Sequence, residues 1–235
     1  MFLVISKRFL WAAGLLVCGI AVLGTVFWQG FAREVPVFSA GDSEPVTVVV
    51  DPGHGGEDGG ASASDGTLES DLNLAVARRL NDLLRFLGQR TVLTRSTTAA
   101  IYTEGDTIRA RKVSDTRNRV ELVNETENAV LVSIHHNSLP SSPATHGAYV
   151  FHNGVGEAQT LAESVQAALN GAVNDSEKQA KKISPTVYLM NHVTAPGVLV
   201  ECGFLTNPSE ASRLKTGEYQ LRLAAVIAAG LLGTP

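Results

Sequence analysis

Short apolar runs alternate with longer amphipathic segments from about residue 46 to the end of the chain. The short runs are rich in β-branched residues and predict strands at 46–50, 91–94, 130–134, 148–151, 186–189 and 198–200. The longer segments predict helices at 68–87, 114–127, 158–172 and 219–232, and another after the Asn207-Pro208 pair. This alternation predicts a three-layer α/β/α sandwich around a mixed, mostly parallel sheet.

The apolar pattern differs at the N-terminus, where residues 9–28 form an uncharged run of 20 positions. As a helix, such a run spans the ~30 Å hydrocarbon core of a bilayer. Lys7 and Arg8 precede it and favour a cytoplasmic start at 1–8, with the rest of the chain outside. We therefore predict a transmembrane anchor at 9–28, a tether at 29–45 and one folded domain at 46–235. A cleaved signal peptide, which would make the domain secreted, and a buried soluble helix are the alternatives.

Composition narrows the function classes. The chain has 235 residues, 44% hydrophobic and 18% charged, with two cysteines, which excludes a disordered chain and a disulfide-dense scaffold. Its net charge is −4, and without residues 1–40, which carry three basic and one acidic side chain, it is −6. A nucleic-acid binder would need a basic face, so we expect no nucleic-acid partner. Cys18 and Cys202 fall in different segments, so we expect no disulfide.

The first chemical signal is the glycine-rich turn in VVVDPGHGGEDGG, which places His54 directly after a strand. Glycines on both sides of His54 allow the backbone to pass close to a ligand. The turn contains neither GK[ST] nor G-x-G-x-x-G, which argues against a nucleotide-binding loop. A lone histidine in such a turn would be an ordinary surface residue, so a metal site is predicted only if further potential ligands follow other strands.

Such ligands follow other predicted strands. VLVSIHHNS ends a strand with His135 and His136, and GVLVECGF ends another with Glu201. The carboxyl ends of strands in open α/β sheets meet at one edge, and Glu69 can join them from the first turn of the long helix. Two histidines and a glutamate with an open fourth position are a ligand set of hydrolytic zinc sites, which leaves a second carboxylate free as a base.

The pattern leaves two choices open within this cluster. Period-2 alternation places His135 and His136 on opposite faces, so either one could face the metal. The acidic ligand is equally undecided, with these candidates: Glu69, Glu57, Asp65 and Asp71.

The motifs DPGHGG, LESDLNLAVA, SIHHNS and LVECGFLTNPSE together resemble the zinc-dependent N-acetylmuramoyl-L-alanine amidases of the third amidase class, over about 46–231. Enzymes of this family cleave peptidoglycan between N-acetylmuramic acid and L-alanine. The resemblance implies one Zn²⁺ per chain held by His54, Glu69 and His135, with His136 as a neighbour. It implies that Glu201 is the catalytic residue, which takes a proton from water and returns it to the leaving amine.

Two longer stretches narrow the resemblance. RARKVSDTRNRVELVN and VYLMNHVTAPGVLVECGFLTNPSEA, together with the membrane-spanning start, are similar to sporulation amidases of endospore-forming bacteria. These remove peptides from spore cortex peptidoglycan, and a muramic acid deacetylase then completes muramic δ-lactam. The resemblance implies a domain on the outer face of the cytoplasmic membrane, in the cell wall or the forespore intermembrane space. A vegetative wall amidase, another zinc peptidase acting on wall peptides and a non-catalytic wall-binding module are the alternatives.

Four further residues have weaker predictions. Asp51 either orients a ligand imidazole or forms the turn, and Asn137 either contacts substrate or caps the strand end. Arg95 and Arg111 border the long polar stretch 96–112, which we expect to be a surface loop over the site or partly mobile. Each arginine either meets a peptide carboxylate or is solvated. Three histidines are expected to be ordinary polar residues, and one cysteine a packed thiol rather than a nucleophile: His146, His152, His192 and Cys202.

Overall fold

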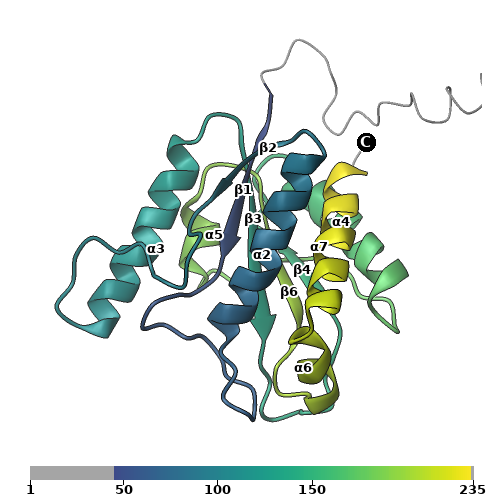
Figure 1. The fold of residues 1–235 in the computed structure, drawn as a ribbon. Helices are drawn as coiled ribbons and strands as arrows, with labels where there is room; N and C mark the ends of the chain where they lie inside the picture. The colour runs from purple at the N-terminus through teal and green to yellow at the C-terminus, as the bar shows by residue number, and fades with distance from the viewer. Residues whose placement is uncertain (1–44, 234–235) are drawn as a thin grey trace, which may run out of the picture. The chain divides into compact units, whose positions relative to one another are not determined.

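A computed structural model describes residues 45–233 of the chain, which form a six-stranded sheet with helices on both faces (Figure 1). The strands are β1 (Thr47–Pro52), β2 (Arg90–Leu93), β3 (Ala129–Asn137), β4 (Tyr149–His152), β5 (Lys181–Lys182) and β6 (Gly197–Phe204). Their order is β2-β1-β3-β6-β4-β5. Strands β2, β1, β3 and β6 are parallel, whereas β4 is antiparallel to β6 and parallel to β5. The predicted mixed, mostly parallel sheet is confirmed.

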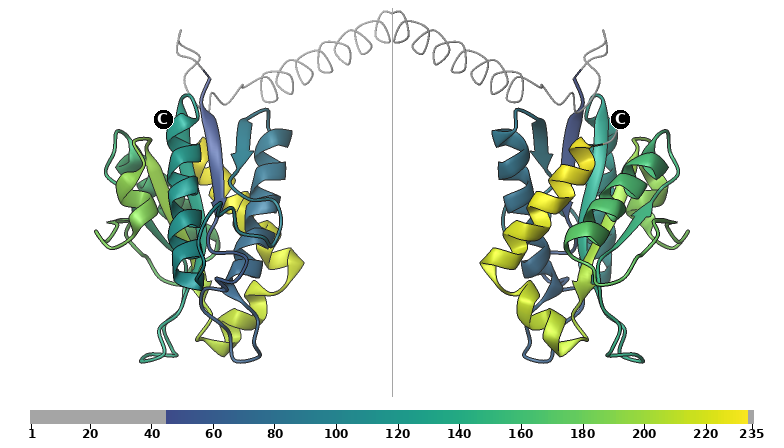
Figure 2. Two further views of the ribbon diagram at one scale, coloured as in Figure 1. Left: turned by 90° about the vertical axis from the view of Figure 1, so that its left-hand side faces the viewer. Right: turned by 90° about the vertical axis from the view of Figure 1, so that its right-hand side faces the viewer.

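Helices form the two outer layers of the predicted sandwich. Figure 2 shows α3 on one side of the sheet and α4 and α7 on the opposite side. The first layer contains α3 (Ile108–Glu125) and α5 (Tyr188–His192), and the second contains α2 (Glu69–Phe86), α4 (Ala158–Ala172) and α7 (Gly217–Leu232). The short α6 (Pro208–Leu214) follows β6, and the side chain of Asn207 caps it by accepting from the Glu210 amide.

Strand β1 illustrates how the core forms on both faces of the sheet. Val48 and Val50 pack in the cluster with α2 and α7, while Val49 between them packs in the cluster with α3 and α5. Successive side chains of a strand point to opposite faces, so a strand covered on both sides is apolar throughout. All three valines are buried, each contributing about 1.5–3 kcal/mol. This packing fixes the strand ends from which the functional residues project.

The predicted strand at 186–189 is wrong. This segment leads into α5 (Tyr188–His192), and β5 lies earlier, at Lys181–Lys182. The apolar run is explained by Leu189 and Met190, which are buried against the sheet from a short helix. Short apolar runs fit a buried helical turn as well as a strand. The exposed lysines of β5 suit an edge strand, where charges discourage pairing with other chains.

Helix α3 begins at Ile108, six positions before the predicted start at 114. Thr107 caps it, because its hydroxyl accepts from the Ala110 amide at 3.1 Å. Residues 108–113 are exposed or half-buried, so no apolar periodicity marks the first turns of this helix. The polar stretch is therefore a loop only over 96–107. This loop lies against the glycine-rich turn, where the Gly56 amide donates to the Thr98 carbonyl at 2.7 Å.

The predicted anchor at 9–28 and most of the tether at 29–45 lie outside the described residues. Within 45–233, no helix has the length and apolar character needed to cross a bilayer.

Candidate active site

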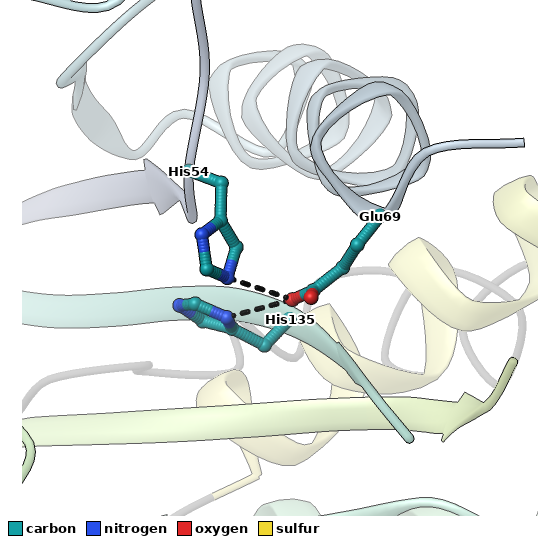
Figure 3. Close-up of side chains that lie close together, drawn as sticks. All are labelled: His54, Glu69 and His135. Atoms are coloured by element: carbon teal, nitrogen blue, oxygen red, sulfur yellow. Dashed lines mark hydrogen bonds and ion pairs between the residues drawn. The ribbon is translucent and has the colours of Figure 1, made fainter. Parts of the chain in front are cut away.

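Three side chains from three elements converge at the carboxyl end of the sheet (Figure 3). His54 follows β1, Glu69 is the first residue of α2, and His135 lies near the end of β3. His54 Nε2 is 3.2 Å from Glu69 Oε1, and His135 Nδ1 is 2.9 Å from the same oxygen. One potential ligand atom from each residue lies within 4.8 Å of the others. Two imidazole nitrogens and a carboxylate oxygen at this spacing could hold a metal ion.

The glycine-rich turn brings His54 to this position. His54 has a φ of 60°, an unusual value for a residue other than glycine, and its neighbours Gly55 and Gly56 also have positive φ. Gly53 lets the turn approach the other histidine: a Cβ there would lie 2.2 Å from Cε1 and Nε2 of His135. Gly53 is thus required for the contact between the turn and β3.

Glu69 is held in place by several donors. Its Oε2 accepts from the Ala61 amide at 2.8 Å, and its Oε1 accepts from Asn73 Nδ2 at 3.3 Å. Burial raises the pKa of Glu69, but His135 and His54 outweigh burial and hold the pKa well below its usual range. The carboxyl is therefore ionised, as a metal ligand must be.

His54 is protonated at neutral pH without a metal. Burial lowers the pKa of His54, but hydrogen bonds and charges from Asp58 and Glu69 outweigh this effect and raise it to about 9. A histidine binds a metal as the neutral imidazole, so metal binding here would release a proton.

The structure places His135, and not His136, in the ligand cluster. His136 is buried on the other side of β3, where its Nδ1 lies 2.7 Å from Asn73 Oδ1. Burial lowers the pKa of His136 to about 4, so it is neutral. Strand alternation left the choice open in the sequence, and the structure decides it because, of these two rings, only that of His135 contacts Glu69, at 2.9 Å. Among the other acidic candidates, two form ion pairs with basic side chains and the third is exposed: Glu57, Asp65 and Asp71.

Glu201 lies beside the cluster, because β6 places it in register with His135 of β3. Within residues 45–233, its Oε2 is buried and has no hydrogen-bond partner. Burial raises the pKa of Glu201 to about 7, with Glu69 adding to the effect and the two histidines opposing it. A carboxyl with a pKa near neutrality can both accept and return a proton, which is the property required of a general acid/base.

The Asp51 carboxylate contacts neither histidine ring, and it is more than a turn former. It is buried and accepts from the hydroxyls of Thr94 at 2.6 Å and Ser133 at 2.7 Å, and from Arg119 Nη1 at 2.7 Å. Arg119 in turn donates to the His54 carbonyl at 2.6 Å. Asp51 therefore acts on the turn through Arg119. No local pattern marks Arg119, because 68 positions separate it from Asp51.

Neither alternative for Arg95 describes its position. Its side chain is buried, and the guanidinium donates to four backbone carbonyls, those of Pro52, Gly53, Ser70 and Thr97. Arg111 pairs with Glu57 at 2.8 Å and lies 5.5 Å from the centroid of the Tyr102 ring. Asn137 Oδ1 accepts from the next backbone amide at 2.7 Å, as expected of a strand end. Substrate contacts by Arg111 and Asn137 remain predictions.

Two residues near the cluster escaped the sequence analysis. Asp58 Oδ2 lies 2.8 Å from His54 Nδ1, and Asn73 contacts both Glu69 and His136. Their spacing was the available signal, since each lies four positions after a candidate ligand. Cys202 is fully buried, and burial raises the pKa of its thiol far above the ordinary value, which argues against a cysteine nucleophile.

Residues 48–232 match the family described as N-acetylmuramoyl-L-alanine amidase. The chain belongs to this amidase family. The germination-specific N-acetylmuramoyl-L-alanine amidase of Bacillus subtilis (strain 168) is 38% identical to this amidase, over 79% of this chain and 78% of the relative. The predicted amidase activity, cleavage between N-acetylmuramic acid and L-alanine, is confirmed at this level.

Solved structures support the same assignment for the fold. The CwlD amidase from Clostridioides difficile, solved in complex with the GerS lipoprotein, aligns with a TM-score of 0.76 and 31% identity, over 80% of this amidase and 98% of that chain. An N-acetylmuramoyl-L-alanine amidase from Clostridium difficile 630 aligns with a TM-score of 0.71 and 29% identity, over 81% and 97%. The α/β fold of this amidase is therefore that of solved members of its family.

Proposed function

We propose that this amidase uses zinc, held by His54, Glu69 and His135, to release stem peptides from spore cortex peptidoglycan, with Glu201 as its catalytic acid/base. The observation that carries the proposal is the approach of two histidines to one Glu69 oxygen, with Glu201 in register beside His135. The donor set fits zinc, which prefers imidazole and carboxylate ligands in a four-coordinate site.

The chain's own residues account for the movement of the proton. Zinc, when bound, supplies a Lewis acid that polarises the scissile carbonyl and lowers the pKa of water toward ~7. Glu201 accepts the proton of the attacking water and then gives it to the amine of the departing L-alanine. Its raised pKa suits both directions of transfer. A positioned acid/base of this kind contributes ~10²–10⁴ in rate.

The spore cortex as substrate source is supported by the names of relatives, one of them called germination-specific and another CwlD. The apolar run at 9–28 would anchor the domain on the outer face of the cytoplasmic membrane. A lipoprotein partner on the same membrane face is compatible with the complex solved for the C. difficile enzyme.

The product also implies a following reaction. Peptide release leaves a free lactyl carboxylate, and a muramic acid deacetylase would expose an amine on the same sugar. Condensation of the two groups, with loss of water, closes a δ-lactam.

The test uses full-length protein in detergent with purified cortex peptidoglycan, and identifies the products by mass. We expect free peptides that begin with L-alanine, loss of activity with a chelator and recovery with zinc. Glu201→Gln should abolish turnover but retain about one zinc per chain, whereas His54→Ala should lose both. Full activity of Glu201→Gln would overturn the assignment of the acid/base.

Two further substrates separate the alternatives. Vegetative peptidoglycan cut faster than cortex peptidoglycan would favour a vegetative wall amidase. Glycan-free peptides cut within the peptide would identify a zinc peptidase. Binding to the wall without peptide release would identify a non-catalytic module.

A further inference from the structure

The two ring nitrogens of His54 have different partners. Nε2 lies 3.2 Å from Glu69 Oε1, inside the ligand cluster, and Nδ1 lies 2.8 Å from Asp58 Oδ2. A histidine that binds a metal through one nitrogen is commonly oriented by an acceptor at the other. We propose that Asp58 is a positioning residue, which holds His54 by Nδ1 so that Nε2 stays directed at the metal position. This inference rests on the proposed metal site.

The turn itself fixes Asp58 opposite the His54 ring. The Gly55 amide donates to the Asp58 carbonyl at 2.9 Å, and the Asp58 amide donates to the Gly55 carbonyl at 3.1 Å. These reciprocal bonds close the turn directly after His54. The backbone thereby places the Asp58 carboxylate beside the His54 ring.

Helix α3 contributes a second contact to the Asp58 carboxylate. Lys112 Nζ lies 2.9 Å from the same Oδ2 that contacts His54. The lysine cation favours the ionised carboxylate, which can only accept a hydrogen bond. Asp58 therefore favours the proton on His54 Nδ1 and leaves the lone pair of Nε2 free for a metal.

Asp58 contacts the His54 ring, and the neighbouring Glu57 provides a comparison. The adjacent Glu57 pairs with Arg111 of α3 at 2.8 Å, in an ion pair parallel to that of Asp58 with Lys112. Asp58 is outside the set of grouped ligand atoms, which come from His54, Glu69 and His135. Glu57 is thus a matched control: it has the same charge, the same turn and the same helix as partner, and its ion pair is with Arg111.

The test measures Zn²⁺ affinity of the metal-free, full-length protein by competition with a chromophoric chelator at pH 7. We expect Asp58→Ala to weaken zinc binding by about 10- to 100-fold, the usual effect of losing such a partner. Asp58→Asn keeps an acceptor oxygen and should recover part of the loss. Lys112→Met should cause a smaller loss than Asp58→Ala, and Glu57→Gln should bind zinc like the parent.

A spectroscopic measurement separates positioning from a general effect on folding. The absorption spectrum of bound Co²⁺ should change in Asp58→Ala and not in Glu57→Gln, while the metal-free variants melt at similar temperatures. If Asp58→Ala binds zinc as tightly as Glu57→Gln, the positioning role is wrong and the metal site stands. If the parent binds zinc no better than His54→Ala, the proposed metal site itself fails. Should Asp58→Ala not fold, Asp58→Asn with parental affinity and spectrum would equally overturn the inference.

Discussion

Replacement of Arg119 by methionine tests whether the buried ion pair behind the glycine-rich turn stabilises the domain. The Asp51 side chain is 1% exposed and that of Arg119 is 4% exposed, and their charged atoms lie 2.7 Å apart. Methionine keeps much of the volume and removes the charge and its hydrogen bonds. The Asp51 carboxylate would then remain buried with two hydroxyl donors and without its ion-pair partner.

The expected loss of stability follows from this uncompensated charge. Removing one partner of a buried pair costs about 3–5 kcal/mol. For a chain of this size, each kcal/mol lowers Tm by about 2–4 °C, so the variant should melt about 6–20 °C below the parent. Arg119 holds the pKa of Asp51 below its usual value against the opposing effect of burial. Without Arg119, burial raises that pKa, so the folded variant binds more protons than the unfolded chain and the loss grows from pH 4 to pH 7.

The assay is thermal unfolding of zinc-free protein, followed by circular dichroism at pH 4.5 and pH 7. Arg117→Met is the control, since Arg117 lies on the same helix and is exposed, where substitutions change stability by about 0.5 kcal/mol or less. Adding Asp51→Asn to Arg119→Met should restore part of the stability at pH 7. If Arg119→Met has the same Tm as Arg117→Met at pH 7, the reasoning is refuted.

Three further predictions concern the metal centre. The pKa of Glu201 rises from 4.5 to about 7 on folding, so the folded state binds more protons than the unfolded chain between these values, and Glu201 destabilises it increasingly as pH rises. Zinc-free Glu201→Gln should therefore melt above the parent at pH 7.5 and close to it at pH 4.5. An equal difference in Tm at both pH values would contradict this. Gly53→Ala should lose both zinc and activity, because its Cβ would lie 2.2 Å from the His135 ring. Gly171→Ala is the control, because there is open space around Gly171, and it should bind zinc normally. Parental zinc content in Gly53→Ala would disprove the steric argument. Zinc at 100 times its dissociation constant should stabilise the parent by about 2.7 kcal/mol, seen as a rise in Tm, and the rise should vanish in His54→Ala.

Most elements of the fold could be predicted from local pattern. The strands with β-branched runs and the helix from Glu69 could be predicted because the spacing of their apolar residues matches the pattern of their buried positions. The start of α3 was missed because residues 108–113 bury no side chain, so no apolar stripe marks its first turns, and its buried residues begin only at Ser114. The run at 186–189 was misassigned because buried helical turns and strands of that length share one composition.

The sequence by itself determined the chemistry of this protein: a histidine in a glycine turn, histidines and a glutamate at strand ends, and the order of motifs typical of its amidase family. Only the tertiary structure decided which nitrogen faces which oxygen. Alternation along β3 allowed His135 or His136 equally, and the structure places the His135 ring beside Glu69 and His54 while the His136 ring contacts Asn73 of α2. The roles of Asp58 and Arg119 depend on α3, which lies distant in sequence and adjacent in space. The sequence pattern predicts which residues are buried, whereas the tertiary contacts determine which partners those residues have.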